Sequence, residues 1–189
     1  MLKFGNESVK SKRYNMQHLL VEIKARTTQS TQIRTFLTQH QADFKGIDYQ
    51  TDTYFQVNQG RLKLREGNIE NHLIQYDRPN QAEAKTSKVL LYKSNPESTL
   101  KQILTNALGI LVVVKKKREI YFIDNVKFHI DEVDNLGHFV EIEAIGNQGE
   151  HQEADLRQQC LHYQQALGIQ TEDLLKVSYS DLLLSDALK

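Results

Sequence analysis

Strict alternation of apolar and polar residues over short segments limits the fold of this chain more than any other feature of its sequence. In residues 16–26, Glu22, Lys24 and Arg26 share one face, and apolar residues fill the positions between them. A period of two over this length is typical of a β-strand that buries one face. We predict seven further strands from related patterns, at residues 52–58, 61–66, 71–79, 86–94, 111–123, 126–133 and 138–145.

Four other segments have the spacing of amphipathic helices. In one of them Asn95 is expected as the N-cap, Pro96 as the first helical residue and Gly109 as the end of the helix. Its apolar stripe is expected to be buried and consists of Leu100, Ile103, Leu104 and Ala107. The other three segments are residues 27–40, residues 150–167 and, as a short helix or a docked tail, residues 178–184.

The composition fits one globular domain, because 39% of the 189 residues are hydrophobic and 25% are charged. The 24 basic residues balance the 24 acidic ones, which argues against a general binder of nucleic acid or of membrane surfaces. Residues 1–15 show no period and are interpreted as a loose extension upstream of a natural start at Met16, so that the domain spans residues 16–189. No apolar run is long enough to cross a bilayer, and we expect a cytoplasmic protein.

Charged residues gather on one face of several predicted strands. Arg61, Lys63 and Arg65 alternate in one strand, and Glu141 and Glu143 alternate in another. For any single strand, such a face is most simply exposed to solvent. Several strands of this kind would instead build a polar interior if their sheet closed on itself, with the helices covering the apolar outer face. The strands and helices together predict an α+β fold.

An interior that carries both signs of charge requires a ligand that uses both. Clustered Arg and Lys side chains repel one another unless an anion lies between them, and Arg suits phosphate oxygens especially well. Clustered carboxylates need a cation, and hard oxygen ligands favour Mg²⁺ or Mn²⁺. A polyphosphate bound with such a metal would satisfy both sets of charges. The single cysteine, Cys160, lies on a helical apolar stripe and is interpreted as a core residue.

Short motifs in a fixed order resemble the CYTH superfamily, the triphosphate tunnel metalloenzymes. The motifs are VEIKAR at 21–26, DTYF at 52–55, GRLKLRE at 60–66, IQYDRP at 74–79, KKREIY at 116–121, IDEVDNLGHFVEIE at 130–143 and YSDLL at 179–183. The ordered set covers nearly the whole chain after the extension, and it is most similar to the branch of class IV adenylyl cyclases. The resemblance implies an α+β fold, a closed antiparallel eight-stranded β-barrel that forms a tunnel, with flanking helices.

The resemblance also implies roles for individual side chains. Four carboxylates would hold or adjoin a divalent metal, Mg²⁺ or Mn²⁺, with the last as a ligand or a neighbour of the ligands: Glu22, Glu141, Glu143 and Asp131. The catalytic residues would clamp the phosphates, and they are Lys24, Arg65 and Arg118. Three further residues would help to bind the substrate: Lys63, Arg78 and Lys116. His18 and His129 share these faces and are interpreted as hydrogen-bonded residues of the tunnel.

The implied function is that of a metal-dependent enzyme acting on a triphosphate. In a class IV adenylyl cyclase-like reaction, ATP gives cyclic AMP and pyrophosphate. Alternatives are a triphosphatase acting on inorganic triphosphate or on an organic one such as thiamine triphosphate, and a non-catalytic binder of polyphosphate or nucleotide. One departure makes the last reading conceivable: the family signature Glu-x-Glu-x-Lys has Leu20 at its first position here. Expected partners are the triphosphate and, by likeness to relatives, a second copy of the chain, but neither nucleic acid nor a membrane.

Overall fold

The computed structural model describes residues 18–77, 85–146 and 151–187 of the chain. These contain eight strands: β1 (His18–Arg26), β2 (Asp43–Phe55), β3 (Arg61–Glu66), β4 (His72–Asp77), β5 (Lys85–Lys93), β6 (Ile110–Ile123), β7 (Val126–Val133) and β8 (Gly137–Gly146). They also contain four α-helices: α1 (Ser30–Gln39), α2 (Leu100–Leu108), α3 (Glu153–Ala166) and α4 (Tyr179–Asp186). In this part of the chain, no helix combines the length and apolar character that a bilayer crossing requires. The predicted extension, residues 1–15, and Arg78 lie outside the described residues.

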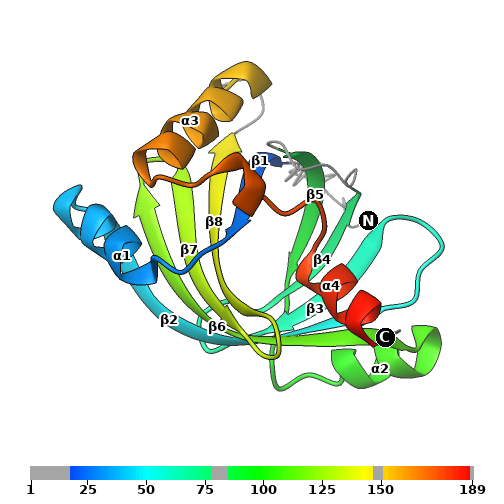
Figure 1. The fold of residues 1–189 in the computed structure, drawn as a ribbon. Helices are drawn as coiled ribbons and strands as arrows, with labels where there is room; N and C mark the ends of the chain where they lie inside the picture. The colour runs from blue at the N-terminus through cyan, green and yellow to red at the C-terminus, as the bar shows by residue number, and fades with distance from the viewer. Residues whose placement is uncertain (1–17, 78–84, 147–150, 188–189) are drawn as a thin grey trace, which may run out of the picture.

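All eight strands pair with antiparallel neighbours in one curled sheet (Figure 1). The pairing order is β1-β5-β4-β3-β2-β6-β7-β8, and β1 also pairs with β8, with Glu22 opposite Glu143 and Lys24 opposite Glu141. The predicted α+β fold with eight antiparallel strands and flanking helices is confirmed. Because side chains alternate between the two faces of a strand, the apolar set faces outward and the charged set lies on the concave face.

The main hydrophobic core lies between the outer face of the sheet and helices α1 and α3. Strands β1, β7 and β8 contribute side chains such as Val21, Phe128 and Ile142, and the helices contribute Leu37 and Leu156. All five have no exposed surface. This layer of helices is the cover that the apolar outer face needs, and it leaves the concave face free for polar residues.

The single cysteine belongs to this core, as predicted. The thiol of Cys160 is fully buried in α3 and donates to the backbone carbonyl oxygen of Val21 at 3.2 Å. Burial raises the pKa of the thiol to about 11, so it stays protonated and unreactive at neutral pH. Cys160 therefore has a packing role.

A smaller core lies under α4 and connects the fold to the concave face. Val114, Phe139 and Tyr179 are buried in it, and Leu182 and Leu183 of α4 pack against them. The N-terminus of α4 is fixed by a capping box, in which the side chain at position 178 and that at position 181 each bond the other's backbone N–H. Because Tyr179 is the first residue of α4 and also lines the pocket described below, this helix holds part of the site in place.

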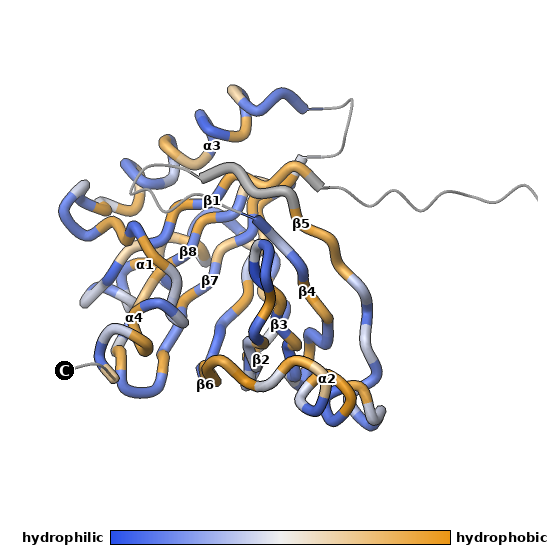
Figure 2. The backbone as a smooth tube through the Cα atoms, turned by 90° about the vertical axis from the view of Figure 1, so that its right-hand side faces the viewer, coloured by the Kyte–Doolittle hydropathy of each residue, from blue (hydrophilic) through white to orange (hydrophobic). Residues whose placement is uncertain are grey.

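The second predicted helix differs from its prediction. Helix α2 begins at Leu100, with Thr99 as its N-cap, while the side chain of Asn95 accepts a hydrogen bond from the backbone N–H of Glu97 at 3.1 Å. An Asn that closes a local turn in this way delays the start of a helix. The prediction of a buried stripe is wrong, because no residue of α2 is buried and Ile103 is 58% exposed. The helix lies beside β2 at one end of the sheet, and no other helix of the described residues lies over it (Figure 2).

Strand β2 is longer than its alternation indicates. It begins at Asp43, whereas the pattern in the sequence starts at residue 52. Its first half pairs with β6 through a register shift between Phe44 and Gly46, and Gly46 has a φ of 119° that favours glycine. The added length brings the buried side chain of Asp48 against the backbone of residues 69 and 70, in the loop between β3 and β4.

Candidate functional site

A pocket of about 370 Å³ lies on the concave face, and every one of the eight strands contributes to its wall. Carboxylates and cations line it in nearly equal numbers. The carboxylates are Glu22, Asp52, Glu70, Glu141 and Glu143. The cations are Lys24, Lys63, Arg65, Lys116, Arg118 and Lys127. The period-two pattern of the strands is the reason that these side chains converge.

One group of charges is centred on Glu141 of β8. Its carboxylate lies 2.5 Å from the Lys24 Nζ and accepts hydrogen bonds from Arg118 at 2.8 Å and from His129 Nδ1 at 3.0 Å. Burial raises the pKa of Glu141, but the charges of Arg118 and Lys24 outweigh it and hold the pKa well below its usual range. Burial and the charge of Arg118 lower the pKa of His129, so its ring is neutral at pH 7. The interpretation of His129 as a hydrogen-bonded interior residue is confirmed.

Asp131 and Tyr179 hold Arg118 in a fixed orientation. The Nε and Nη2 atoms of Arg118 donate to the two oxygens of Asp131 at 2.7 and 2.5 Å, and the Tyr179 hydroxyl donates to Asp131 Oδ2 at 2.9 Å. Asp131 has no exposed surface. Since Asp131 is not among the residues that line the pocket and bonds Arg118 with both of its oxygens, it is better suited to orient Arg118 than to coordinate a metal.

Three side chains form a group that could hold a metal ion. One ligand atom each from His129, Glu141 and Glu143 lies within 4.8 Å of the others. Glu22 lines the same pocket and sits opposite Glu143 in the pairing of β1 with β8. Carboxylate oxygens with one neutral imidazole nitrogen suit Mn²⁺, and the carboxylates by themselves suit Mg²⁺. The residues present therefore fit a hard divalent cation.

A second group of charges is centred on Asp52 of β2. Arg65 donates to its two oxygens at 2.9 and 3.0 Å, Lys116 contacts it at 2.7 Å and Lys63 at 3.1 Å. Burial raises the pKa of Asp52, but the three cations together hold the pKa well below its usual range. Three cations around one carboxylate leave an excess of positive charge, which an added anion would complement.

Glu70 enters the pocket from the loop between β3 and β4. The buried carboxylate of Asp48 fixes this loop by accepting hydrogen bonds from two backbone N–H groups, including that of Glu70 at 3.0 Å. Gly67 permits the approach, because a Cβ at this position would meet Asp48 Oδ1 at 2.4 Å. Glu70 accepts a hydrogen bond from Arg65 at 2.9 Å and also pairs with Lys127 of β7. The loop thus places a carboxylate between two cations of the pocket.

Lys116 should make the stability of the protein depend on pH. Burial lowers the pKa of its amine to about 7, against the raising effect of Asp52. In the unfolded chain the pKa is about 10.4. Between these values the unfolded state binds more protons, so this group makes stability rise with pH from about 7 to about 10.4. From pH 7.5 to 9.5 the gain is on the order of 2 kcal/mol.

Urea unfolding of the wild-type protein and of Lys116→Met at both pH values would measure this contribution. The variant keeps Lys63 and Arg65 on Asp52, so its fold should persist. We expect the wild type to gain more free energy of unfolding than the variant as the pH rises. An identical pH dependence for the two proteins would show that Lys116 has an ordinary pKa.

Nearly all the side chains predicted for the site are in the pocket or against it. Those that line the pocket are Glu22, Lys24, Lys63, Arg65, Lys116, Arg118, Glu141 and Glu143. Asp131 lies behind Arg118 and is hydrogen-bonded to it. The structure brings these residues together, whereas their chemical roles remain predictions.

Three charged residues of the pocket were not predicted from the sequence. Asp52 lies in the DTYF motif, and Lys127 has the same phase as His129 and Asp131. The alternation of their strands could therefore have indicated that both side chains face the interior. Glu70 lies in a loop, where no period indicates which side chain points inward.

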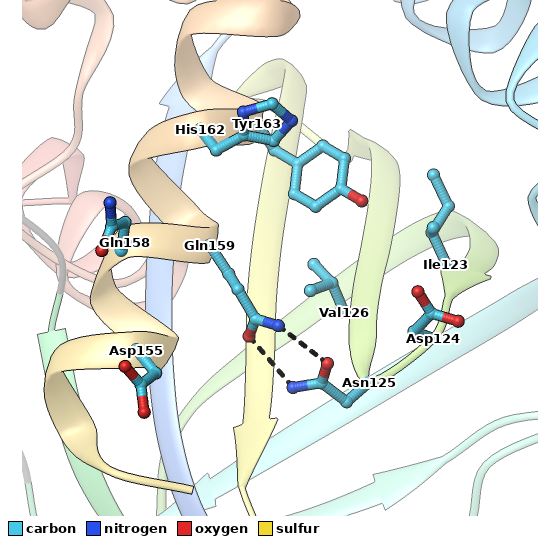
Figure 3. A pocket seen from close by; sticks show the side chains of 9 residues that line it. All are labelled: Ile123, Asp124, Asn125, Val126, Asp155, Gln158, Gln159, His162 and Tyr163. Atoms are coloured by element: carbon cyan, nitrogen blue, oxygen red, sulfur yellow. Dashed lines mark hydrogen bonds between the residues drawn. The ribbon is translucent and has the colours of Figure 1, made fainter.

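A second cavity, of about 430 Å³, lies between α3 and the turn from β6 to β7 (Figure 3). The side-chain amides of Asn125 and Gln159 donate to each other's oxygens at 3.0 and 2.9 Å, as the dashed lines show. Asp124 and Asp155 at its rim are exposed. None of the residues described in its wall is a Lys or Arg, so this cavity is poorly suited to a phosphate ligand.

Three solved structures illustrate the likeness of this fold to known ones. The PH1012 protein of Pyrococcus horikoshii OT3 is 24% identical, with a TM-score of 0.73 over 86% of this chain and 98% of that chain. A conserved hypothetical protein of Pyrococcus furiosus is 21% identical, with a TM-score of 0.72 over 86% and 99%. A protein of Vibrio parahaemolyticus, described as a proposed adenylate cyclase, is 20% identical, with a TM-score of 0.69 over 88% and 98%. At these identities the likeness concerns the fold.

The comparison with protein families is more specific. No curated protein matches the chain. The family model of the CYTH domain matches residues 18–179, from the first residue of β1 to the first residue of α4. This span contains all eight strands and every charged residue of the pocket. The chain therefore belongs to the CYTH domain family.

Proposed function

We propose that this protein is a metal-dependent enzyme acting on a triphosphate, and specifically an adenylyl cyclase-like enzyme that converts ATP to cyclic AMP and pyrophosphate. The observation that carries the proposal is the convergence of two opposite sets of buried charges in one pocket. Five basic side chains, the amine of Lys116 and a metal-capable acidic group face the same space. A triphosphate with a divalent cation is a ligand that complements both sets of charges.

In this proposal the curled sheet acts as a closed tunnel around the phosphate chain. Lys24, Lys63, Arg65, Lys116 and Arg118 bind phosphate oxygens. The metal, Mg²⁺ or Mn²⁺, is held by Glu141 and Glu143 with Glu22, and when bound it supplies positive charge that stabilises the phosphate oxygens in the transition state. Asp131 keeps Arg118 aimed at the pocket. Positioning and electrostatics then supply most of the catalysis.

The cyclase reaction needs only this positioning. The ribose 3′-oxygen forms a bond to the α-phosphorus, the bond from that phosphorus to the pyrophosphate oxygen breaks, and the proton of the hydroxyl passes to solvent. The Vibrio parahaemolyticus protein, proposed to be an adenylate cyclase, has the same fold and supports ATP as the first substrate to test.

Incubation with ATP and Mn²⁺, followed by separation of the products, tests the proposal. Cyclic AMP and pyrophosphate are the expected products. Release of inorganic phosphate would show that the protein hydrolyses the triphosphate instead of cyclising it. Binding without turnover would show that the protein is a nucleotide binder. If the protein neither binds nor converts ATP, thiamine triphosphate and tripolyphosphate, the proposal is wrong.

Lys24→Met is expected to weaken triphosphate binding about tenfold or more, as loss of a charge-assisted contact does. Lys24 lies 2.5 Å from Glu141, and its ammonium is 3.9 Å from the centre of the Tyr179 ring. Titration calorimetry with a non-hydrolysable ATP analogue measures the affinity. Lys45→Met, at an exposed position of β2, serves as the control and should leave the affinity unchanged. Equal affinities for the two variants would contradict the role of Lys24.

A further inference from the structure

Of the five carboxylates described in the pocket wall, Glu70 alone comes from a loop. The other four lie on β1, β2 and β8, where pairing with the neighbouring strands fixes the backbone on both sides. Glu70 lies in the connection between β3 and β4, and two cations from different strands contact it, Arg65 of β3 and Lys127 of β7. Glu70 therefore differs from the other carboxylates in how it is held.

The Glu70 carboxylate bridges these two cations. Its Oε2 atom accepts hydrogen bonds from Arg65 Nη1 at 2.9 Å and from Gln50 Nε2 at 3.2 Å, and its Oε1 atom pairs with Lys127 Nζ. Burial raises the pKa of Glu70, but the charges of Arg65 and Lys127 outweigh it and hold the pKa below its usual range. The side chain thus carries a full negative charge between two positive ones.

The groups that hold Glu70 are of the kind that binds phosphate. Guanidinium and ammonium groups donate to phosphate oxygens as they do to carboxylate oxygens. Arg65 donates from each of its three nitrogens, twice to Asp52 and once to Glu70. A phosphate group bound between Arg65 Nη1 and the Lys127 ammonium would therefore take the place of the Glu70 carboxylate. The protein itself fills an anion-binding position of its own pocket.

The backbone of the loop is held in place, so that displacement of Glu70 concerns its side chain. Asp48 accepts hydrogen bonds from the backbone N–H groups of Ile69 and Glu70 at 2.9 and 3.0 Å. The side chain of Asn71 bonds both the N–H and the C=O of Gly67, at 3.2 and 2.8 Å. The Glu70 side chain is 18% exposed and can rotate about its single bonds toward solvent. The carboxylate can thus leave and return without a rearrangement of the fold.

We propose that Glu70 is an intramolecular competitor of the phosphate chain, which pairs with Arg65 and Lys127 in the ligand-free protein and leaves them when a phosphate group binds there. This inference rests on the proposed function and adds a residue that sets how tightly phosphates are held. Pyrophosphate carries several negative charges, and a pocket lined by cations would release it slowly. Pairing of Glu70 with the two cations stabilises the empty pocket and so favours release.

Titration calorimetry on Glu70→Gln tests the proposal, with pyrophosphate in EDTA and with a non-hydrolysable ATP analogue and Mn²⁺. We expect both ligands to bind about tenfold more tightly than to the wild type, because the variant keeps the size of the side chain and lacks the competing charge. Equal affinities would overturn the inference. Weaker binding of the analogue would also overturn it, because Glu70 would then be a ligand of the metal. If the wild type binds neither ligand, the proposed function fails and the inference with it.

Glu66→Gln is the matched control, four positions earlier in the chain. Glu66 is the last residue of β3, pairs with Lys101 at 2.6 Å and is not among the residues that line the pocket. Its substitution should leave both affinities unchanged, and a gain equal to that of Glu70→Gln would overturn the assignment to position 70. If Glu70→Gln does not fold, Glu70→Ala is the second variant and should bind pyrophosphate about tenfold more tightly as well.

A double-mutant cycle with Lys127→Met locates the competition. In the Lys127→Met background, Glu70 has lost one of the two cations that it shares with the ligand. The gain in pyrophosphate affinity from Glu70→Gln should therefore fall from about tenfold to about threefold. The same gain in both backgrounds would show that Glu70 and the ligand do not compete for Lys127, which would overturn the inference.

Discussion

Glu143→Gln is expected to lower metal-dependent turnover by about 100-fold or more while the protein stays folded. Glu143 belongs to the metal-capable group, and its side chain is 16% exposed. Its contact with His129 Nδ1 is 3.7 Å long, beyond hydrogen-bonding distance. Removing its charge should therefore affect the metal more than the internal hydrogen bonds of the pocket.

Initial rates measured over a range of Mn²⁺ concentrations test this expectation. Because a lost ligand weakens metal binding, the variant should need more Mn²⁺ to reach half of its maximal rate. Glu132→Gln is the control, since Glu132 is exposed on the neighbouring strand β7. If Glu143→Gln keeps the wild-type rate and metal dependence, Glu143 is not a metal ligand.

A substitution of Glu141 would test metal binding less clearly than Glu143→Gln. It bonds to Lys24, Arg118 and His129 at once, and it is 4% exposed. Its substitution would disturb three side chains together with the metal. The sequence shows two carboxylates at the same spacing on one strand, and only the arrangement of the neighbouring strands reveals that one of them is an internal ion-pair partner.

Alternation predicted the faces of the strands because it is a local property. Glu22 and Lys24 of β1, Lys63 and Arg65 of β3 and Glu141 of β8 all face the pocket as their phase indicates. The charges on these faces then indicated the kind of ligand. The eight-stranded antiparallel architecture was implied by the resemblance to the family.

Features that depend on distant contacts could not be read in this way. The first half of β2 has no clear period and is held by its pairing with β6. Glu70 points inward because Asp48 accepts a hydrogen bond from its backbone N–H, a contact between residues 22 positions apart. In the first two cases the deciding partner lies elsewhere in the chain. The stripe of α2 has the spacing of a buried face, yet Ile103 stays exposed among the described residues.

Arg118→Met is expected to cost about 3–5 kcal/mol of unfolding free energy and to abolish turnover. Arg118 is 2% exposed and pairs with two buried carboxylates, Asp131 and Glu141. Its removal leaves Glu141 with Lys24 but takes the charged partner of Asp131 away, and an uncompensated ion is costly in a region of low polarity. Urea unfolding at pH 7 measures the loss.

A matched control separates burial from the count of hydrogen bonds. Arg34 makes three hydrogen bonds to Glu119, but its side chain is 42% exposed. Arg34→Met should therefore cost at most about 1 kcal/mol, since solvent screens the pair. Equal losses for Arg34→Met and Arg118→Met would mean that burial of the ion pair does not set the cost of removing its arginine.

Lowering the pH should reduce the loss of unfolding free energy that Arg118→Met causes. In the wild type, Arg118 offsets burial and keeps the pKa of Asp131 below its usual range. Without Arg118, burial should raise the pKa of Asp131 above its value in the unfolded chain, so the variant takes up a proton on folding. Its stability relative to the wild type must then recover as the pH falls from 7 toward 4. Adding Asp131→Asn should recover part of the loss at pH 7 by the same reasoning, because the buried charge is gone.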